Sequence, residues 1–173
     1  MHALGLLRPL LPEIAAMEGV PQPPEFHPEG DVWVHTLLAL EKLESPSFVL
    51  AMGALLHDIG KPVTITHEDR IRFNEHEKAG ERMAAEICDR LRLSAEERDH
   101  VAWMVGAHML FKDTPKMRPA KLKRLLAHPG FDDLVEMHKA DCLASHGNIE
   151  EYERLTKMKR EMPPEVLSPP PLV

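Results

Sequence analysis

The sequence predicts an all-α fold organised as a single domain. Its 173 residues fall within the usual size of one domain. Aromatic residues make up only 5% of the chain, whereas Leu, Ala and Met are abundant, and this composition favours helices over sheet. Apolar residues also recur at spacings of three and four in most segments, which is the spacing of one helix face.

Short helices and a rigid loop are predicted at the start of the chain. An apolar stripe runs from Leu4 to Met17, but Pro9 and Pro12 interrupt it, so we expect one or two short helices there. Four prolines and two glycines fall within residues 19–30, and this density is typical of a rigid loop.

The first longer helix is predicted from Val32 to about Leu43. Asp31 precedes it and is a suitable N-cap, because its carboxylate can accept from the first free backbone N–H groups. A histidine falls on its inward stripe at helical spacing. The stripe comprises Val32, His35, Thr36, Ala39 and Leu43.

The chain is organised around residues Gly53 to Pro62, where an apolar helix is predicted to end. The run Phe48 to Leu56 forms this helix, and Ser45-Pro46 offers a cap followed by a proline at the first helical position. We expect Gly60 to adopt the left-handed conformation that stops the helix, and Pro62 to prevent its resumption.

His57 and Asp58 therefore lie at a helix end, where an adjacent imidazole and carboxylate can turn toward one point. Such a pair suits a hard or borderline divalent metal ion. The alternative is a buried pair whose two members satisfy each other. The other histidines decide between these interpretations.

The next segment contains the only sheet that we expect. Alternating polar and apolar residues predict a short β-hairpin near residues 63–73. Asn74 and Glu77 then form a variant capping box, which opens a helix to about Leu91 with His76 near its start.

Three more helices are predicted in the last third of the chain. The capping box Ser94 to Glu97 opens a helix to about Leu110 with His108 on its inward stripe, and a basic helical segment follows between Lys112 and Arg124. A further helix runs from Phe131 to about Ser145. One of its faces carries Leu134, Met137, His138 and Asp141.

The domain prediction covers nearly the whole chain. A mostly charged helix is expected near Ile149 to Met162, so that residues 1–162 form one domain. Residues 163–173 are rich in proline and are predicted to form an extended C-terminal tail.

Composition excludes several classes of protein. A net charge of −7 argues against extended nonspecific binding to nucleic acid, which needs many uncompensated Lys and Arg side chains. No run approaches 18 apolar residues and no signal peptide opens the chain, so we expect a cytoplasmic protein without membrane contact. Cys88 and Cys142 are too far apart in sequence to suggest a disulfide framework or a thiolate zinc site.

Six titratable side chains are predicted to point inward from five helices. Buried carboxylates are costly unless they are paired, hydrogen-bonded or bound to metal. A single core histidine needs no more than a hydrogen bond, but one shared metal centre accounts for all six residues together. The six are His35, His57, Asp58, His76, His108 and Asp141.

The order of these residues resembles the HD superfamily of metal-dependent phosphohydrolases, which has an all-helical fold. The shared pattern is a histidine, then the adjacent His57-Asp58 within H-D-I-G-K, then a late aspartate. Residues 4–147 resemble more closely the HD region of bacterial tRNA nucleotidyltransferases, the CCA-adding enzymes. The motifs that carry this likeness lie at residues 25–37, 53–62, 74–77 and 138–147.

The nucleotide-adding head of those enzymes has no counterpart in this sequence. The chain contains neither G-G-x-V-R-D nor the Asp-x-Asp pair that holds magnesium, so we expect no nucleotide addition. It also lacks the G-Y-P signature of cyclic-di-GMP phosphodiesterases, and Glu75 stands where relatives often have glycine.

The resemblance implies a centre of one or two divalent metal ions. His35, His57, Asp58 and Asp141 would bind the first ion, His76 and His108 would add a second, and Asp58 would bridge them as a catalytic residue. Ligands rich in histidine favour Mn, Fe, Co, Ni or Zn over Mg.

Further residues are candidates for substrate binding. Lys61, beside the HD pair, would hold a phosphoryl oxygen or, as a second catalytic residue, neutralise the leaving alkoxide, or it is a solvated lysine at a helix end. His138 would orient Asp141, touch phosphate or simply pack, and His27 would line the mouth of the site. The basic segment, with Arg118 and Lys121, would attract phosphate groups or form a solvated face.

The expected activity is that of a phosphohydrolase on nucleotides or RNA ends. The resemblance implies a 2′,3′-cyclic phosphodiesterase that is also a phosphomonoesterase on 2′-phosphates. One alternative is a nucleotidase acting on 5′-(deoxy)nucleoside monophosphates. The other is a non-catalytic module that binds RNA or protein, which should hold no stoichiometric metal.

Overall fold

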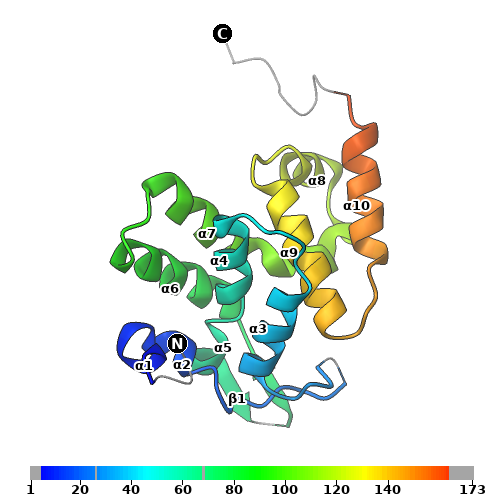
Figure 1. Ribbon diagram of the computed structural model, residues 1–173. Coiled ribbons are helices and arrows are strands. Elements are labelled where there is room, and N and C mark those ends of the chain that lie inside the picture. The colour runs from blue at the N-terminus through cyan, green and yellow to red at the C-terminus, as the bar shows by residue number, and fades with distance from the viewer. Residues whose placement is uncertain (1–4, 26, 68, 164–173) are drawn as a thin grey trace.

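The computed structural model describes residues 5–25, 27–67 and 69–163, and it is helical with one small antiparallel sheet, as predicted (Figure 1). The proline-rich tail predicted for residues 163–173 lies outside the described residues apart from Pro163. No helix in these ranges is long and apolar enough to cross a membrane. The helices are α1 (Leu7–Leu10), α2 (Pro12–Ala15), α3 (Val32–Glu41), α4 (Phe48–Leu56), α5 (Lys61–Thr64), α6 (His76–Arg90), α7 (Ala95–Ala107), the 3₁₀ helix η2 (His108–Lys116), α8 (Pro119–Leu126), α9 (Phe131–Ala144) and α10 (Glu150–Glu161).

Helix α4 lies at the centre of the fold. It packs against α3, α7 and α9, while α6 pairs with α7 on one side of the molecule and α10 packs on α9 at the other (Figure 1). The hydrophobic core extends from Leu7 in α1 to Leu155 in α10. A central, almost wholly apolar helix explains why its last residues are buried from every side.

The predicted hairpin is present beside the end of α4. Strand β1 (Ile65–His67) pairs antiparallel with β2 (Ile71–Phe73), with Ile65 opposite Phe73. The proline-interrupted N-terminal stripe likewise forms the two short helices α1 and α2. Both results follow from local signals, namely alternation in the hairpin and proline in the helices.

Two of the predicted helix caps are confirmed. Asp31 accepts from the backbone N–H of Val34 at 2.9 Å, and Ser94 and Glu97 form a reciprocal capping box. The buried face of α3 carries Val32, His35, Thr36 and Ala39 as expected.

The other two predicted caps are wrong. Ser47 rather than Ser45 caps α4, accepting from Leu50 N–H at 3.1 Å. Helix α6 begins at His76 without a side-chain cap, because Glu75 before it adopts a left-handed conformation with φ 58°. The Asn74–Glu77 capping box therefore does not form.

The predicted roles of Gly60 and Pro62 are also wrong. Gly60 is right-handed, with φ −80° and ψ −13°, and Pro62 lies in the first turn of α5 instead of preventing a helix. Glycine is required there because of a close approach: a Cβ on Gly60 would lie 2.1 Å from the carbonyl oxygen of His76. The contact holds the start of α6 against the turn that carries His57 and Asp58.

Helix α7 ends earlier than predicted. The α-helix stops at Ala107, and the chain continues from His108 as the 3₁₀ helix η2. Since a 3₁₀ helix has three residues per turn, the change re-aims the side chains after Ala107. His108 stands at this change of direction.

The close approach at Gly60 predicts a large difference between two glycine substitutions. Gly60→Ala places its methyl group against fixed backbone and should destabilise the fold by about 3 kcal/mol or more. Gly53→Ala meets the flexible end of Met104 instead, with Cε at 2.6 Å, and gains helix propensity in α4. Thermal unfolding of both variants checks this expectation, and equal losses in Tm would contradict it.

Candidate metal centre

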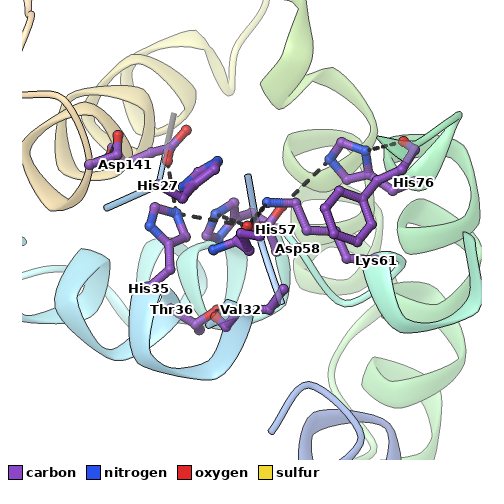
Figure 2. Close-up of polar contacts among 12 residues, drawn as sticks. His27, Val32, His35, Thr36, His57, Asp58, Lys61, His76 and Asp141 are labelled. Atoms are coloured by element: carbon purple, nitrogen blue, oxygen red, sulfur yellow. Dashed lines mark hydrogen bonds and ion pairs between the residues drawn. The ribbon is translucent and has the colours of Figure 1, made fainter. Parts of the chain in front are cut away.

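Four imidazoles surround the carboxylate of Asp58. The Nε2 atoms of His57 and His35 lie 3.3 and 3.9 Å from Asp58 Oδ2. The Nε2 atoms of His76 and His108 lie 3.5 and 3.9 Å from Oδ1. Figure 2 shows His35 on one side of Asp58 and His76 on the other. Each carboxylate oxygen therefore faces its own pair of histidines.

All five side chains are buried, none more than 6% exposed. They come from different elements: His35 from α3, His57 and Asp58 from the end of α4, His76 from the first turn of α6, and His108 from the start of η2. Their ligand atoms form two groups of three that share Asp58. The first group is His35, His57 and Asp58, and the second is Asp58, His76 and His108. Within each group the atoms lie within 4.8 Å of one another.

Main-chain carbonyls set the orientation of three of the four rings. The Nδ1 atoms of His57, His76 and His108 lie 2.8, 2.9 and 2.6 Å from the carbonyl oxygen three residues earlier. A carbonyl can only accept, so each Nδ1 carries a proton, and in the neutral ring Nε2 presents a lone pair toward Asp58. These carbonyls belong to Ala54, Phe73 and Val105.

Lone pairs that face a carboxylate repel it unless a proton or a cation lies between them. Burial alone would lower the pKa of His57, but the Asp58 carboxylate raises it to about 9. Burial, with the charges of His57 and His76, lowers the pKa of His108 to about 3. Nε2 of both His35 and His57 is buried without a hydrogen-bond partner in the described part of the chain.

This donor set fits a divalent metal ion. It offers imidazole nitrogens and a carboxylate, the ligands that borderline transition metals prefer. A cation would satisfy the orphaned Nε2 atoms and the buried charge of Asp58 together.

Asp141 adds a carboxylate from α9 beside His35. Its Oδ1 lies 3.0 Å from His35 Nε2, and its side chain is 29% exposed (Figure 2). Burial alone would raise its pKa, but the close contact with His35 Nε2 and the charge of His57 hold the pKa of Asp141 below its usual value. It is therefore an ionised carboxylate at the accessible edge of the first group.

Glu29 is a buried contact of the centre that sequence reasoning missed. Its Oε1 lies 2.6 Å from His35 Nδ1 and 2.9 Å from His27 Nδ1, and its side chain is 6% exposed. His35 thus faces a carboxylate where the other three rings face a carbonyl. The loop has no helical or strand periodicity, and the only signal was the place of Glu29 within the motif at residues 25–37.

The loop that carries Glu29 is closed by main-chain contacts. Pro21 forms an antiparallel bridge with Asp31, and the N–H of Gln22 donates to the carbonyl of Gly30 at 3.0 Å. These contacts fix the loop ahead of α3 and hold Glu29 against His35.

Lys61 is buried in the centre instead of being solvated at a helix end. Its Nζ donates to Asp58 Oδ2 at 2.6 Å and to Gln22 Oε1 at 2.5 Å, and the residue is 5% exposed (Figure 2). The ammonium group compensates the charge of Asp58 at Oδ2, the oxygen that the Nε2 atoms of His35 and His57 also face. Gln22, like Glu29, lies in the irregular loop and was not predicted.

A cavity of about 1010 Å³ reaches the centre. Asp58, Lys61 and Asp141 line it, as do the predicted contacts His27 and His138. His138 also packs, since its ring stacks on Phe111 with centroids 4.1 Å apart.

The structure does not bring Arg118 and Lys121 into this cavity. Both are exposed and do not line it, whereas Lys112, from the same basic segment, does. Helix α8 buries Leu122, Leu125 and Leu126, so its cations lie on its outer side.

Known proteins are similar to this chain in sequence. The family model of the HD domain matches residues 31–159. The Multifunctional CCA protein of Laribacter hongkongensis is 35% identical over 166 residues, which cover 90% of this chain and 41% of that relative. The protein of the same name from Acinetobacter baumannii is 35% identical over 124 residues, 70% of this chain and 30% of the relative. The chain therefore spans less than half the length of these curated relatives.

The shared carboxylate predicts how metal ions should affect stability. Saturation with Mn²⁺, Ni²⁺ or Co²⁺ at about 100 times the Kd should raise the Tm by about 5–10 °C. Asp58→Asn should abolish that increase, because both groups of ligands lose a charged oxygen. Asp113→Asn, which changes an exposed carboxylate of η2, is the matched control. A full metal-dependent increase in the Asp58 variant would refute the shared site.

Glu29 should control one group of ligands and not the other. Glu29→Gln should weaken metal binding at the His35 side about 10–100-fold, because the buried charge behind His35 Nδ1 is lost. Binding at the His76–His108 side should stay unchanged. Titration calorimetry of the metal-free protein resolves the two steps. Glu25→Gln, which changes a carboxylate of the same loop that lines the cavity, serves as control, and equal weakening of both steps would contradict the assignment.

Proposed function

Because the chain belongs to the HD domain family, we propose that it is a phosphohydrolase that opens 2′,3′-cyclic phosphates and removes 2′-phosphates from nucleotides or RNA ends. HD domains form a superfamily of metal-dependent phosphohydrolases, which implies a substrate that bears phosphate. The resemblance to the HD region of bacterial tRNA nucleotidyltransferases supports the narrower choice of 2′,3′-cyclic ends.

The division of the Asp58 carboxylate between two histidine pairs is the observation that carries the proposal. His35, His57, Asp58 and Asp141 would hold one ion, and His76 and His108 would hold a second that shares Asp58. We propose Mn, Fe, Co, Ni or Zn for these positions, since imidazole nitrogens supply most of the ligands. When bound, such ions supply a water molecule of lowered pKa and stabilise charge on phosphoryl oxygens.

The protein's own side chains then bind and orient the ester. The Lys61 ammonium lies 2.6 Å from Asp58 and lines the cavity, so a phosphate group that reaches Asp58 meets a fixed cation. Charge-assisted hydrogen bonds of this kind are stronger than neutral ones, and they favour the more highly charged transition state.

Two neutral imidazoles complete the wall of the cavity. Burial lowers the pKa of both His27 and His138, so near neutral pH each ring carries one proton and one lone pair. The His138 ring can donate a hydrogen bond to a phosphoryl oxygen without adding charge beside the proposed metal ligands, whereas the Nδ1 proton of His27 faces Glu29 Oε1 at 2.9 Å.

A panel of phosphate esters tests the proposed function. With Mn²⁺, Ni²⁺ or Co²⁺, we expect turnover of 2′,3′-cyclic nucleotides and 2′-monophosphates, and its loss on chelation of the metal or in Asp58→Asn. Asp113→Asn should retain activity.

Two results of the same panel would overturn the proposal. Turnover confined to 5′-deoxynucleoside monophosphates would favour the nucleotidase alternative. Absence of both stoichiometric metal and turnover would favour a binding module.

A further inference from the structure

The cavity is larger than a single phosphate group requires. Its volume of about 1010 Å³ stands at the upper end of the roughly 300–1,000 Å³ of ordinary ligand pockets. Asp58 and Asp141 of the metal centre line it, and residues from the β1–β2 hairpin and from η2 supply much of the remaining wall. The wall beyond the metal centre is therefore available to other parts of a substrate.

This outer wall is rich in cations. Arg70, Arg72 and Lys112 line it, and Glu25 is the carboxylate that lines it outside the metal centre. Arg72 pairs with Asp69 at 2.8 Å, but within the described ranges neither Arg70 nor Lys112 makes an ion pair. Unpaired cations around one concave, partly apolar surface focus a positive potential, which an anion would relieve.

The two unpaired cations come from separate parts of the fold. Arg70 directly precedes β2, and Lys112 lies in η2, which follows α7. Two segments far apart in sequence thus each direct a cation to the same cavity, whereas the rest of the basic segment lies outside it. Cations that only form a solvated face have no reason to converge on one cavity from two separate segments.

Aromatic surface lies on the same wall. Phe73, half-buried in β2, lines the cavity, and so does the half-buried ring of His138, which is backed by the buried Phe111. Nucleic-acid bases stack on aromatic side chains, and sites for single strands combine such rings with cations that contact the backbone.

We propose that Arg70 and Lys112 form a second phosphate subsite, which binds the phosphodiester between the terminal nucleotide and the one before it. The preferred substrate is then the 3′ end of a short single strand, not a free mononucleotide. The inference rests on the proposed function, because it assumes that the metal centre takes the terminal phosphate. It adds contacts to one or two internucleotide phosphates and so does not require extended nucleic-acid binding.

The first arm of the test compares two substrates with the same terminal base. In Mn²⁺, we expect kcat/KM for a trinucleotide with a 2′,3′-cyclic end to exceed that of the cyclic mononucleotide by about tenfold or more. Lys112→Ala and Arg70→Ala should each remove most of that advantage and leave mononucleotide turnover unchanged. Lys116→Ala, which changes another exposed lysine of η2 outside the cavity, is the matched control and should change neither value.

The second arm measures binding without turnover. For the metal-free protein and the 3′-phosphorylated trinucleotide, the slope of log Kd against log salt concentration should fall by about 0.7 for each cation removed from the subsite. Lys116→Ala should leave this slope unchanged. This arm does not depend on catalysis, so it decides the subsite even if no ester is hydrolysed, a result that would refute the proposed function alone.

Several outcomes would overturn the subsite. Equal kcat/KM values for the two substrates would do so. So would equal affinities of the metal-free wild-type protein and its Lys112→Ala and Arg70→Ala variants for the trinucleotide. If Lys116→Ala matched Lys112→Ala in either arm, the effect would be one of net charge and not of a site.

Discussion

The fold depends on how it compensates one buried carboxylate. Asp58 is 2% exposed at the end of an apolar helix, where an uncompensated charge would be costly. Four imidazoles and a lysine surround it, and they come from α3, the end of α4, α5, α6 and η2, while Asp141 of α9 lies beside His35. Because these elements are far apart in sequence, the requirements of Asp58 bring together most of the helices that pack around α4.

Local rules predicted much of this architecture, and contacts between elements explain the errors. The caps at Asp31 and Ser94 involve groups within three residues, so sequence is sufficient to place them. Gly60 could not be interpreted in this way, because its constraint is a carbonyl of α6 that only the folded chain brings near. The first turn of α6 starts without a cap for a related reason, since packing against Gly60 and the contact of His76 with Phe73 hold it in place.

The candidate site was predictable where its residues follow a helical period. His35, His108 and Asp141 were found on inward stripes. The structure places His35 and His108 beside Asp58, and Asp141 beside His35. Glu29 and Gln22 lie in a proline-rich loop without a period, so no pattern indicated that they are buried. Charge content was equally uninformative: Lys61 is buried, whereas Arg118 and Lys121, from the most basic segment, face solvent outside the cavity.

The orientation of the imidazole rings bears on how such a centre can change during evolution. His57, His76 and His108 are each aligned by a peptide carbonyl, a group that every amino acid supplies, so their neighbours can vary without misaligning them. His35 relies on a side chain in the loop that precedes α3. Selection can therefore adjust the first group of ligands by replacing one residue, Glu29. The rings of the second group are oriented by main-chain carbonyls, which a substitution does not remove. Divergence in metal preference among related chains should begin at that loop.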